Sequence, residues 1–411
     1  MRRRSVLASL AIALMAGVFS PIAAMAQDRE VVTFAAPLFS GDRGPSFRAW
    51  VEKFNASQDK IQVVPATVPF SSFANTIFTQ IAGGGGPDII RWELNDFYPA
   101  VDAGMMMSLD DVISDADYKF INADSLMKID GKRYGVIFTA APYQMIYNKA
   151  LIATPPKTFD ELLSMAKAAT TGDVFGYAFR TTAAESAGFW QDLCDFVFGF
   201  GGRWADGKGN LTVNSPDVVK GVAAYKKVYD AGIIPKGADA ATYRRMFMQG
   251  KVAMMVDNAG VVGSISTAAP NINYGAAPSP FPDPHQGAIL ATLAINAKTP
   301  HKQAAVTFMK WILGQGQLGL LGLPGIVGGG VVVQRPPLGP NAPKGLEEAL
   351  NVYNASMENG LPQLVPGFEV QTPQMQEIIL NKVIAVLQNN VDPQKAMDDA
   401  QAEIEKRVLH K

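Results

Sequence analysis

The hydrophobic positions of the N-terminal third alternate between the period of a strand and that of a helix. Short apolar runs predict strands, and between them apolar residues recur every three to four positions, which predicts helices. The successive elements are expected at 31–34, 47–54, 61–64, 73–81 and 87–90. The first of these helices collects large apolar side chains on one face, those of Phe47, Trp50, Val51 and Phe54. Strands and helices in alternation predict an α/β fold, and this stretch would form half of a doubly wound sheet.

The middle of the chain predicts two strands followed by a helix. After a turn, Tyr134–Phe138 is rich in residues that favour strands. A second strand is expected at Tyr143–Tyr147, after a bend at Pro142. Thr158 and Glu161 then have the spacing of a capping box, in which the two side chains satisfy free backbone N–H groups at a helix start.

The C-terminal half predicts further helices, separated by loops rich in proline and glycine. Ser215 and Pro216 are residue types preferred at the N-cap and first position of a helix. Helices are expected at 216–230, 300–312, 374–388 and 393–409. The glycines between 314 and 330 have no evident physical role in the sequence alone.

The N-terminal residues have the pattern of a signal peptide. Arg2–Arg4 precede the apolar stretch Val6–Phe19, which is too short to cross a bilayer core of about 30 Å comfortably. Ala24–Ala26 is a small-residue cleavage site, so the mature chain is expected to begin at Gln27 and to reside in the periplasm. No cysteine stands directly after the apolar stretch, where a lipid anchor would be attached. The adjacent arginines leave the general secretory and twin-arginine export routes both open.

Composition indicates a globular chain and excludes several classes of function. Of 411 residues, 48% are hydrophobic and 18% are charged, a balance that supports a packed core. A formal net charge of −1 offers no basic surface to nucleic acid. Cys194 is the only cysteine, which excludes an internal disulfide and a thiolate metal cluster.

Short catalytic motifs are present only as fragments. Gly83–Gly86 is followed by Pro87 and not by the Lys-Ser/Thr of a phosphate-binding loop, so we interpret it as a helix end. Ser125 and Ser164 each precede a lysine by three positions, but the Lys-Thr-Gly partner motif of penicillin-recognising enzymes is missing. The three histidines have neither triad nor metal-site spacing. We therefore expect no enzymatic activity, no metal and no cofactor.

A cluster of acidic residues between 110 and 117 suggests calcium at first sight. Its aspartates lack the spacing and the glycine of an EF-hand loop. Ser108 instead fits the N-cap of a helix whose first turn carries acidic residues, which the helix dipole favours.

Several short segments resemble, in their order and spacing, the extracellular solute-binding proteins of ABC importers, in the sugar-binding group related to maltose- and glycerol-phosphate-binding proteins. The segments are Gly131–Lys149, Pro155–Leu162, Gly201–Trp204, Thr212–Pro216 and Phe247–Met255. The resemblance extends from about residue 31 to 312. It implies a two-lobed α/β clamp, each lobe a mixed sheet flanked by helices, with the ligand in the cleft between the lobes.

The resemblance also implies that the chain crosses between the lobes more than once. We expect a signal peptide over 1–26, a first lobe from 27–138 and 287–338, and a second lobe from 139–286 and 339–411, joined by a hinge. The implied ligand is a mono- or oligosaccharide or a polyol, and the implied partners are the membrane permease subunits of an ABC transporter. We expect a monomer that does not bind nucleic acid.

A sugar site needs flat aromatic platforms for C–H faces and fixed polar groups for hydroxyls. Trp92 follows a predicted strand, the place where open α/β sheets bind ligands, and Trp204 follows two glycines. Residue chemistry and the resemblance together predict a ligand-binding set of Phe39, Ser40, Asp42, Phe70, Arg91, Trp92, Glu93, Tyr143, Trp190, Gly202, Trp204, Asp257, Asn258 and Gly287.

Two other functions stay open at this stage. The first is a binding protein for an anionic solute such as glycerol phosphate, using one or more of the arginines Arg91, Arg180 and Arg203. The second is a secreted glycosidase using two carboxylates from Glu93, Asp96 and Asp257. The family often has an aromatic residue where this chain has Gly260–Val262, a departure that leaves the identity of the ligand undecided.

Overall fold

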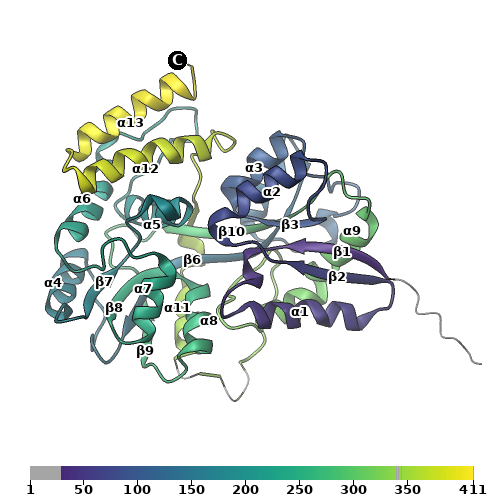
Figure 1. Cartoon of the computed structure of the whole chain (residues 1–411), viewed down its shortest axis with the longest axis horizontal. Coiled ribbons are helices and arrows are strands. Elements are labelled where there is room, and N and C mark those ends of the chain that lie inside the picture. Colours follow the sequence, from purple (N-terminus) through teal and green to yellow (C-terminus); the bar gives the residue numbers. More distant parts are fainter. Residues whose placement is uncertain (1–28, 339, 341, 344, 411) are drawn as a thin grey trace, which may run out of the picture.

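The fold was analysed in a computed structural model, which describes residues 29–338, 340, 342–343 and 345–410. These residues form two lobes side by side, each with strands at its centre and helices around them (Figure 1). The expected two-lobed α/β clamp is therefore confirmed. The predicted signal peptide lies outside the described residues. Within the described ranges, no helix combines the length and apolar character needed to cross a membrane.

One sheet runs through both lobes, in the strand order β2-β1-β3-β10-β6-β8-β7, with β11 beside β10 and β9 beside β6. The first three strands are parallel, as expected for a doubly wound half-sheet, whereas β10 is antiparallel to its neighbours β3 and β6. The strands are β1 (Glu30–Ala35), β2 (Ile61–Ala66), β3 (Ile89–Trp92), β4 (Lys128–Ile129), β5 (Lys132–Arg133), β6 (Val136–Asn148), β7 (Phe175–Ala178), β8 (Val252–Asn258), β9 (Tyr274–Ala277), β10 (Gln286–Ile295) and β11 (Gly360–Pro362).

The helices cover both faces of this sheet and, apart from the one expected after Ser108, confirm the helices expected from the sequence within a few residues. They are α1 (Gly44–Ser57), α2 (Phe73–Ala82), α3 (Leu94–Asp102), α4 (Phe159–Ala169), α5 (Ser186–Gly199), α6 (Pro216–Asp230), α7 (Ala240–Met248), α8 (Ala259–Ala268), α9 (Lys302–Trp311), α10 (Gln317–Leu321), α11 (Leu346–Ala355), α12 (Thr372–Gln388) and α13 (Pro393–Arg407). The C-terminal pair α12 and α13 lies over α5 and α6 of the second lobe, and the N-terminal end of α12 faces α2 and α3 across the space between the lobes (Figure 1).

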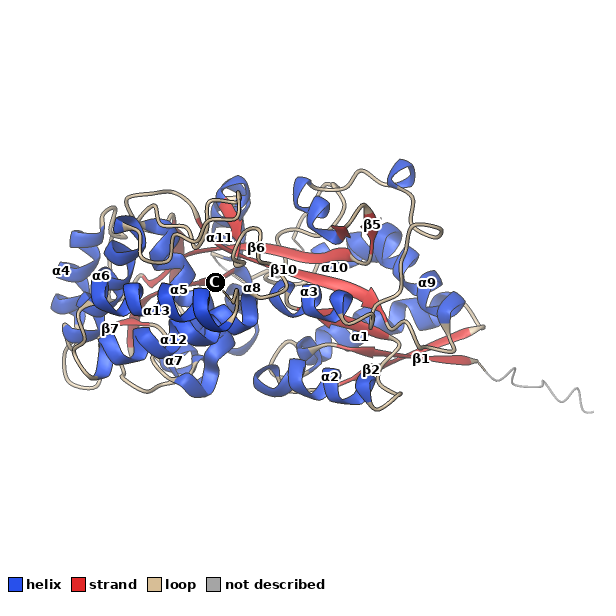
Figure 2. Cartoon of the chain, turned by 90° about the horizontal axis from the view of Figure 1, so that it is seen from above, coloured by secondary structure: helices blue, strands red, loops and turns tan. Residues whose placement is uncertain are grey.

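Strand β6 connects the two lobes without a break, together with β10 (Figure 2). The expectation of two strands separated by a bend at Pro142 is therefore wrong. Up to Pro142, β6 pairs with β10, and from Tyr143 onward it pairs with β8 and β9. Proline cannot donate a ladder hydrogen bond, and here it stands at the residue where the partner strand changes. The missing N–H therefore does not end the strand.

Each lobe has its own apolar core. In the first lobe, Trp50 of α1 packs against Phe138, Phe308 and Trp311, with ring centroids 5.2 to 6.0 Å apart. In the second lobe, α5 is buried along nearly its whole length between the sheet and the helices α6 and α12. This explains why most of α5 is apolar, whereas a surface helix has one polar face. Its polar residues Gln191, Asp192 and Asp195 are buried and accept hydrogen bonds from neighbours within the protein.

Residues 108–117 do not form the expected α-helix. The chain turns after Ser108, and only Asp115–Asp117 adopts a short 3-10 turn. Asp110 accepts a hydrogen bond from the backbone N–H of Arg133 at 2.9 Å, which fixes the turn against β5. The Asp110 carboxylate, which we expected in the first turn of a helix, therefore binds the backbone of a neighbouring strand instead.

The glycine-rich stretch 314–330 packs its backbone against the connecting strand β6. The backbone N–H of Ala140 donates to Gly328 at 3.1 Å. A Cβ atom at Gly330 would lie 2.3 Å from the carbonyl oxygen of Ile137, too close for any side chain. Glycine is therefore needed at Gly330 for this close approach of two backbones.

Candidate ligand-binding cleft

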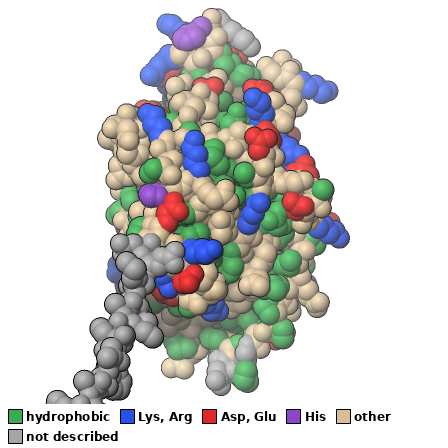
Figure 3. Space-filling view, turned by 90° about the vertical axis from the view of Figure 1, so that its right-hand side faces the viewer, with side chains coloured by type: hydrophobic (Ala, Val, Ile, Leu, Met, Phe, Trp, Pro, Cys, Tyr) green, Lys and Arg blue, Asp and Glu red, His purple; other side chains and the backbone are tan. Residues whose placement is uncertain are grey.

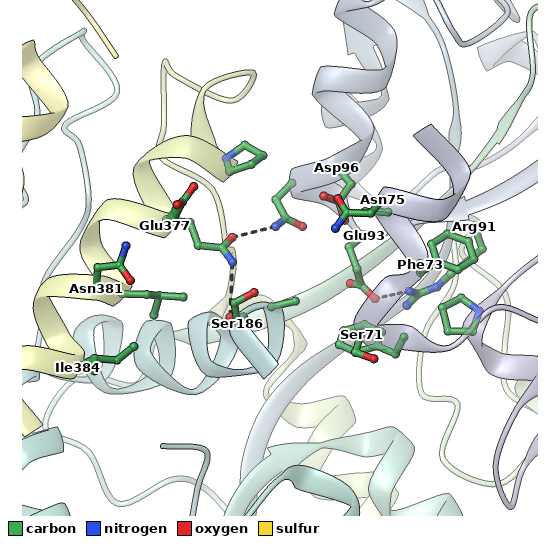
Figure 4. Close-up of a pocket in the computed structure, with 18 residues that line it drawn as sticks. Ser71, Phe73, Asn75, Arg91, Glu93, Asp96, Ser186, Glu377, Asn381 and Ile384 are labelled. Atoms are coloured by element: carbon green, nitrogen blue, oxygen red, sulfur yellow. Dashed lines mark hydrogen bonds and ion pairs between the residues drawn. The ribbon is translucent and has the colours of Figure 1, made fainter. Parts of the chain in front are cut away.

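A cavity of about 350 Å³ lies between the lobes (Figure 4). Its first-lobe wall comes from the start of α2 and from the turn between β3 and α3, and its second-lobe wall comes from α12 and the start of α5. The lining residues are Pro37, Phe70, Ser71, Phe73, Ala74, Asn75, Arg91, Glu93, Asn95, Asp96, Ser186, Ala187, Pro373, Gln376, Glu377, Leu380, Asn381 and Ile384. Such a concave site with several convergent polar groups is typical of small-molecule binding.

The turn between β3 and α3 supplies the charged groups of the first-lobe wall. Strand β3 ends at Trp92, so Arg91 and Glu93 flank a buried residue and can turn to the same side of the chain. They form an ion pair, with side chains 6% and 15% exposed (Figure 4). The Nε atom of Arg91 has no hydrogen-bond partner among the described residues. This Nε atom is itself buried, so Arg91 meets the cavity as one half of its ion pair with Glu93.

Asp96, in the first turn of α3, lies beside this ion pair. Burial raises the pKa of Asp96 to about 7, and the neighbouring charge of Glu93 adds to the effect, whereas Arg91 opposes it. No hydrogen bond or ion pair to the Asp96 carboxylate is found in the described part of the chain. The cleft therefore holds a carboxyl group that titrates near neutral pH.

The two lobes meet at one edge of the cavity through amide side chains. Asn95 Nδ2 donates to Gln376 Oε1 at 3.0 Å, and Gln376 Nε2 donates to the backbone oxygen of Ser186 at 3.5 Å (Figure 4). Glu377 and Asn381 of α12 lie one helical turn apart and line the same cavity. Amide groups donate and accept hydrogen bonds, as the hydroxyls of a sugar or polyol require.

A second, smaller cavity of about 20 Å³ continues toward the strands that join the lobes and shares Glu93, Asn95 and Ala187 with the first. Trp190 lines it and donates its indole N–H to the backbone oxygen of Gln363 at 2.9 Å. An aromatic ring therefore stands at the inner end of the cleft.

Four residues of the predicted set line one of these cavities: Phe70, Arg91, Glu93 and Trp190. The remaining ten lie elsewhere. Ser40 and Asp42 are exposed on the surface, whereas Phe39 is buried in the first-lobe core. Gly202 packs against α6, where a Cβ atom would lie 2.9 Å from the backbone of Val218.

Two tryptophans that were predicted to bind ligand, Trp92 and Trp204, lie in the cores of the lobes. Trp92 is fully buried, packs on Phe73 and Phe78 and places its indole N–H 3.3 Å from the sulfur of Met106. Trp204 is also fully buried and stacks on Trp190, with centroids 4.8 Å apart and planes 20° from parallel. Trp204 therefore supports the ring that lines the cleft and does not line it itself.

The predicted polar groups of the second lobe take part in internal contacts. Asp257 is fully buried and accepts hydrogen bonds from both Nε and Nη2 of Arg244, at 2.8 and 2.7 Å. Asn258 caps α8 through the N–H of Gly260. The last two predicted residues are also internal: the Tyr143 hydroxyl donates to Gln191 at 2.8 Å, and the N–H of Gly287 donates to Asp195 at 2.9 Å.

Sequence reasoning missed the cavity wall formed by α12. The helix was expected, but its polar residues Gln376, Glu377 and Asn381 were not distinguished from its other polar residues, such as Gln374, Lys382 and Gln388. Their spacing, which places them on one side of the helix, was the available signal.

The arginines and carboxylates of the two alternative functions are separated by the fold. Arg180 is buried and paired with Asp192 at 2.6 Å, and Arg203 binds backbone oxygens outside both cavities. Only Arg91 lines the cleft, where Glu93 neutralises it. Of the proposed glycosidase carboxylates, Glu93 and Asp96 line the cleft, whereas Asp257 is held by Arg244. Within the described ranges, no group of three acidic, histidine or cysteine side chains is arranged to hold a metal ion.

Comparisons with known proteins agree with this geometry. Among curated proteins, the chain is 28% identical over 282 residues to the maltotriose-binding protein of Pyrococcus abyssi, covering 64% of this chain and 58% of that protein. It is 25% identical over 205 residues to the sn-glycerol-3-phosphate-binding periplasmic protein of Agrobacterium fabrum, covering 44% and 45%. Thus the matched region spans less than two thirds of the length of either relative.

Solved structures share the fold over nearly the whole chain. A maltose-bound structure from T. maritima superposes with a TM-score of 0.76 at 20% identity, covering 92% of this chain and 99% of that one. The family model of bacterial extracellular solute-binding proteins matches residues 49–318, well over half of the sequence. With its two lobes, its strands shared between them and its polar cleft, this chain belongs to the bacterial extracellular solute-binding protein family.

Proposed function

We propose that the protein is the periplasmic solute-binding component of an ABC importer and captures a sugar or polyol between its lobes. The observation that carries this proposal is the cleft itself, because hydrogen-bonding groups from both lobes line one cavity of about 350 Å³. A ligand that contacts both walls stabilises the closed arrangement. The closed form is then presented to the membrane permease, by the hinge closure common among periplasmic binding proteins.

The hinge lies where the chain passes between the lobes. Strand β6 passes at Pro142, and β10 begins beside it, since Ala288 pairs with Pro142. We place residues 27–138 and 287–338 in the first lobe and 139–286 and 339–411 in the second. Residues 1–26 are proposed to act as the export signal, so that the mature periplasmic chain begins at Gln27.

The groups that line the cleft favour a hydroxyl-rich ligand over a phosphate. Amide side chains stand on both walls, whereas the one arginine is already paired with Glu93. A phosphate recognised by arginine needs a guanidinium free for two parallel hydrogen bonds. The same relatives include maltotriose- and glycerol-phosphate-binding proteins, so the two ligand classes are best separated by direct measurement.

A ligand panel tests the proposal. Purified mature protein is screened by thermal shift against monosaccharides, maltodextrins, polyols and glycerol phosphates. A ligand at a hundredfold excess over its Kd stabilises the folded protein by about 2.7 kcal/mol, so binding raises Tm. The bound sugar should be recovered chemically unchanged after prolonged incubation. Hydrolysis at catalytic rates, or binding of glycerol phosphate alone, would overturn the proposal.

A further inference from the structure

The cleft is lined by more carboxylate groups than positively charged groups. Four of them line the main cavity: Arg91, Glu93, Asp96 and Glu377. Arg91 and Glu93 pair with each other. This leaves two carboxylates, Asp96 on the first lobe and Glu377 on the second, facing the same space from opposite walls (Figure 4).

Neither of these carboxylates is neutralised by the rest of the described chain. No ion pair or side-chain hydrogen bond to Asp96 or Glu377 is found there. Glu377 also borders a neighbouring hollow that contains Arg407, but that arginine pairs with Glu403. A paired carboxylate gains nothing further from a ligand, whereas an unpaired one in a cleft can gain a cationic partner.

A small metal ion is not the expected partner. Metal ions need several ligands converging on one point, and no group of three suitable side chains occurs in the described ranges. The carboxylates instead lie on opposite walls of a cavity large enough for a sugar ring, with Asn75, Asn95, Gln376 and Asn381 around them. Such an arrangement suits an organic cation that also carries hydroxyl groups.

We propose that the cleft prefers a saccharide or polyol bearing a protonated amine, and that Asp96 and Glu377 determine this preference. This inference rests on the proposed function and deepens it. An ammonium group offers three hydrogen-bond donors and a positive charge to the carboxylate beside it, and the negative charge of the other carboxylate also favours a cationic ligand. The amide side chains bind the hydroxyls, as they would in a neutral sugar. Both lobes then contact one charged ligand, so the charge of the ligand helps to stabilise the closed arrangement of the lobes.

The burial of Asp96 supports this assignment. Burial, together with the neighbouring charge of Glu93, raises the pKa of its carboxyl group to about 7. The charged groups that face it are Glu93 and Arg91 on its own side and Glu377 on α12. A bound ammonium group stabilises the ionised form, so binding displaces a proton from Asp96 below pH 7. Affinity for an amine should therefore fall as the pH is lowered through 7.

The test uses isothermal titration calorimetry with matched probes. Glucosamine oligosaccharides of one to three units are compared with their N-acetylated forms, with maltodextrins of equal length, with glucose 6-phosphate and with spermidine. We expect the free amine to bind at least tenfold more tightly than its N-acetylated form at pH 7.5. Asp96→Asn and Glu377→Gln should each reduce this ratio severalfold. Asp102→Asn removes an exposed carboxylate from the end of the same helix and serves as the control.

The outcomes separate this inference from the proposed function. If neutral sugars bind as tightly as amines, the charge preference is wrong and the solute-binding function stands. If spermidine binds as well as the amino sugars, the ligand is a cation without a sugar and the inference is overturned. If no saccharide binds at all, both fail. Thermal unfolding of each variant shows whether it is folded, and the amine-to-acetyl ratio of a folded Asp96→Asn protein decides the role of Asp96.

Discussion

Asp96 and Asp257 are two carboxylates with opposite surroundings. Asp257 is fully buried in the second lobe, and although burial alone would raise its pKa, the Arg244 guanidinium and its two hydrogen bonds lower it below the ordinary value. Asp96 is half-buried in the cleft, has no such partner in the described chain, and has a pKa raised to about 7. The comparison shows that a buried, well-paired carboxylate stabilises the protein, whereas an unpaired one in a cavity is available to a ligand.

Truncation of Trp204 should give the largest effect. The Trp204→Ala variant removes a fully buried ring that stacks on Trp190, and we expect a loss of about 3–5 kcal/mol in the free energy of unfolding. Ligand affinity should fall much less, since Trp204 lines neither cavity. Urea unfolding and calorimetry on the same preparation measure both. A variant of normal stability that fails to bind sugar would return Trp204 to the ligand site.

Removal of the Asp257 charge should come next. Asp257→Asn leaves Arg244, whose side chain is 24% exposed, without its carboxylate, and we expect a loss of about 3 kcal/mol. The variant should keep its affinity for ligand once folded, whereas Asp96→Asn should bind an amine less tightly. Chemical unfolding and titration of ligand check the two statements. Equal losses of affinity in both variants would remove the distinction between the two carboxylates.

The pH dependence of Asp96 should have the opposite sign to that of Asp257. A pKa raised to about 7 means that the folded state keeps a proton which the unfolded chain, with a pKa near 3.8, has lost. This contribution to stability is present below pH 4 and is lost as the pH rises toward 7. Asp96→Asn should therefore become more stable relative to the wild type between pH 5 and pH 8, by about 1–3 kcal/mol. A constant difference over that range would contradict the raised pKa.

Loss of the contact between the lobes should give the smallest effect. Asn95→Ala removes the 3.0 Å hydrogen bond to Gln376, worth about 1 kcal/mol. We expect a more open average shape without ligand, measured as a larger radius of gyration in small-angle scattering. The control is Asn210→Ala, an exposed residue whose side chain bonds only within its own turn. An unchanged radius would show that this contact does not hold the lobes together.

The sequence predicted the elements of the fold better than it predicted the site. Helices and strands follow from periodicity, and the N-cap at Thr158 was confirmed, with its hydroxyl accepting from the N–H of Glu161 at 3.2 Å. The single strand through Pro142 was missed, because a change of partner strand has no local signature. Arg91 and Glu93 were placed at the cleft, but Trp92 between them was misassigned, since alternate residues of a strand point to opposite faces.

The second wall of the cleft was beyond prediction for a different reason. Gln376 reaches Asn95 across 281 positions of sequence, a distance at which no pattern of spacing carries information. Tyr143, Asp257 and Gly287 all lie close to the strands that join the lobes, yet in the structure their polar groups are used by neighbours within the protein. Position along a strand was predictable, but the direction of each side chain and its partner were not.

That separation of 281 residues also has a consequence for the order of events during biosynthesis. The first-lobe wall of the cleft is made early, but α12 emerges only after about nine tenths of the chain has been synthesised. Contacts between residues so far apart in the chain form late in folding, because the loop between them must close first. A chain interrupted before α12 would hold the strands of the sheet but, of the opposite wall, only the start of α5. The ability to capture a ligand therefore appears among the last properties that the protein acquires.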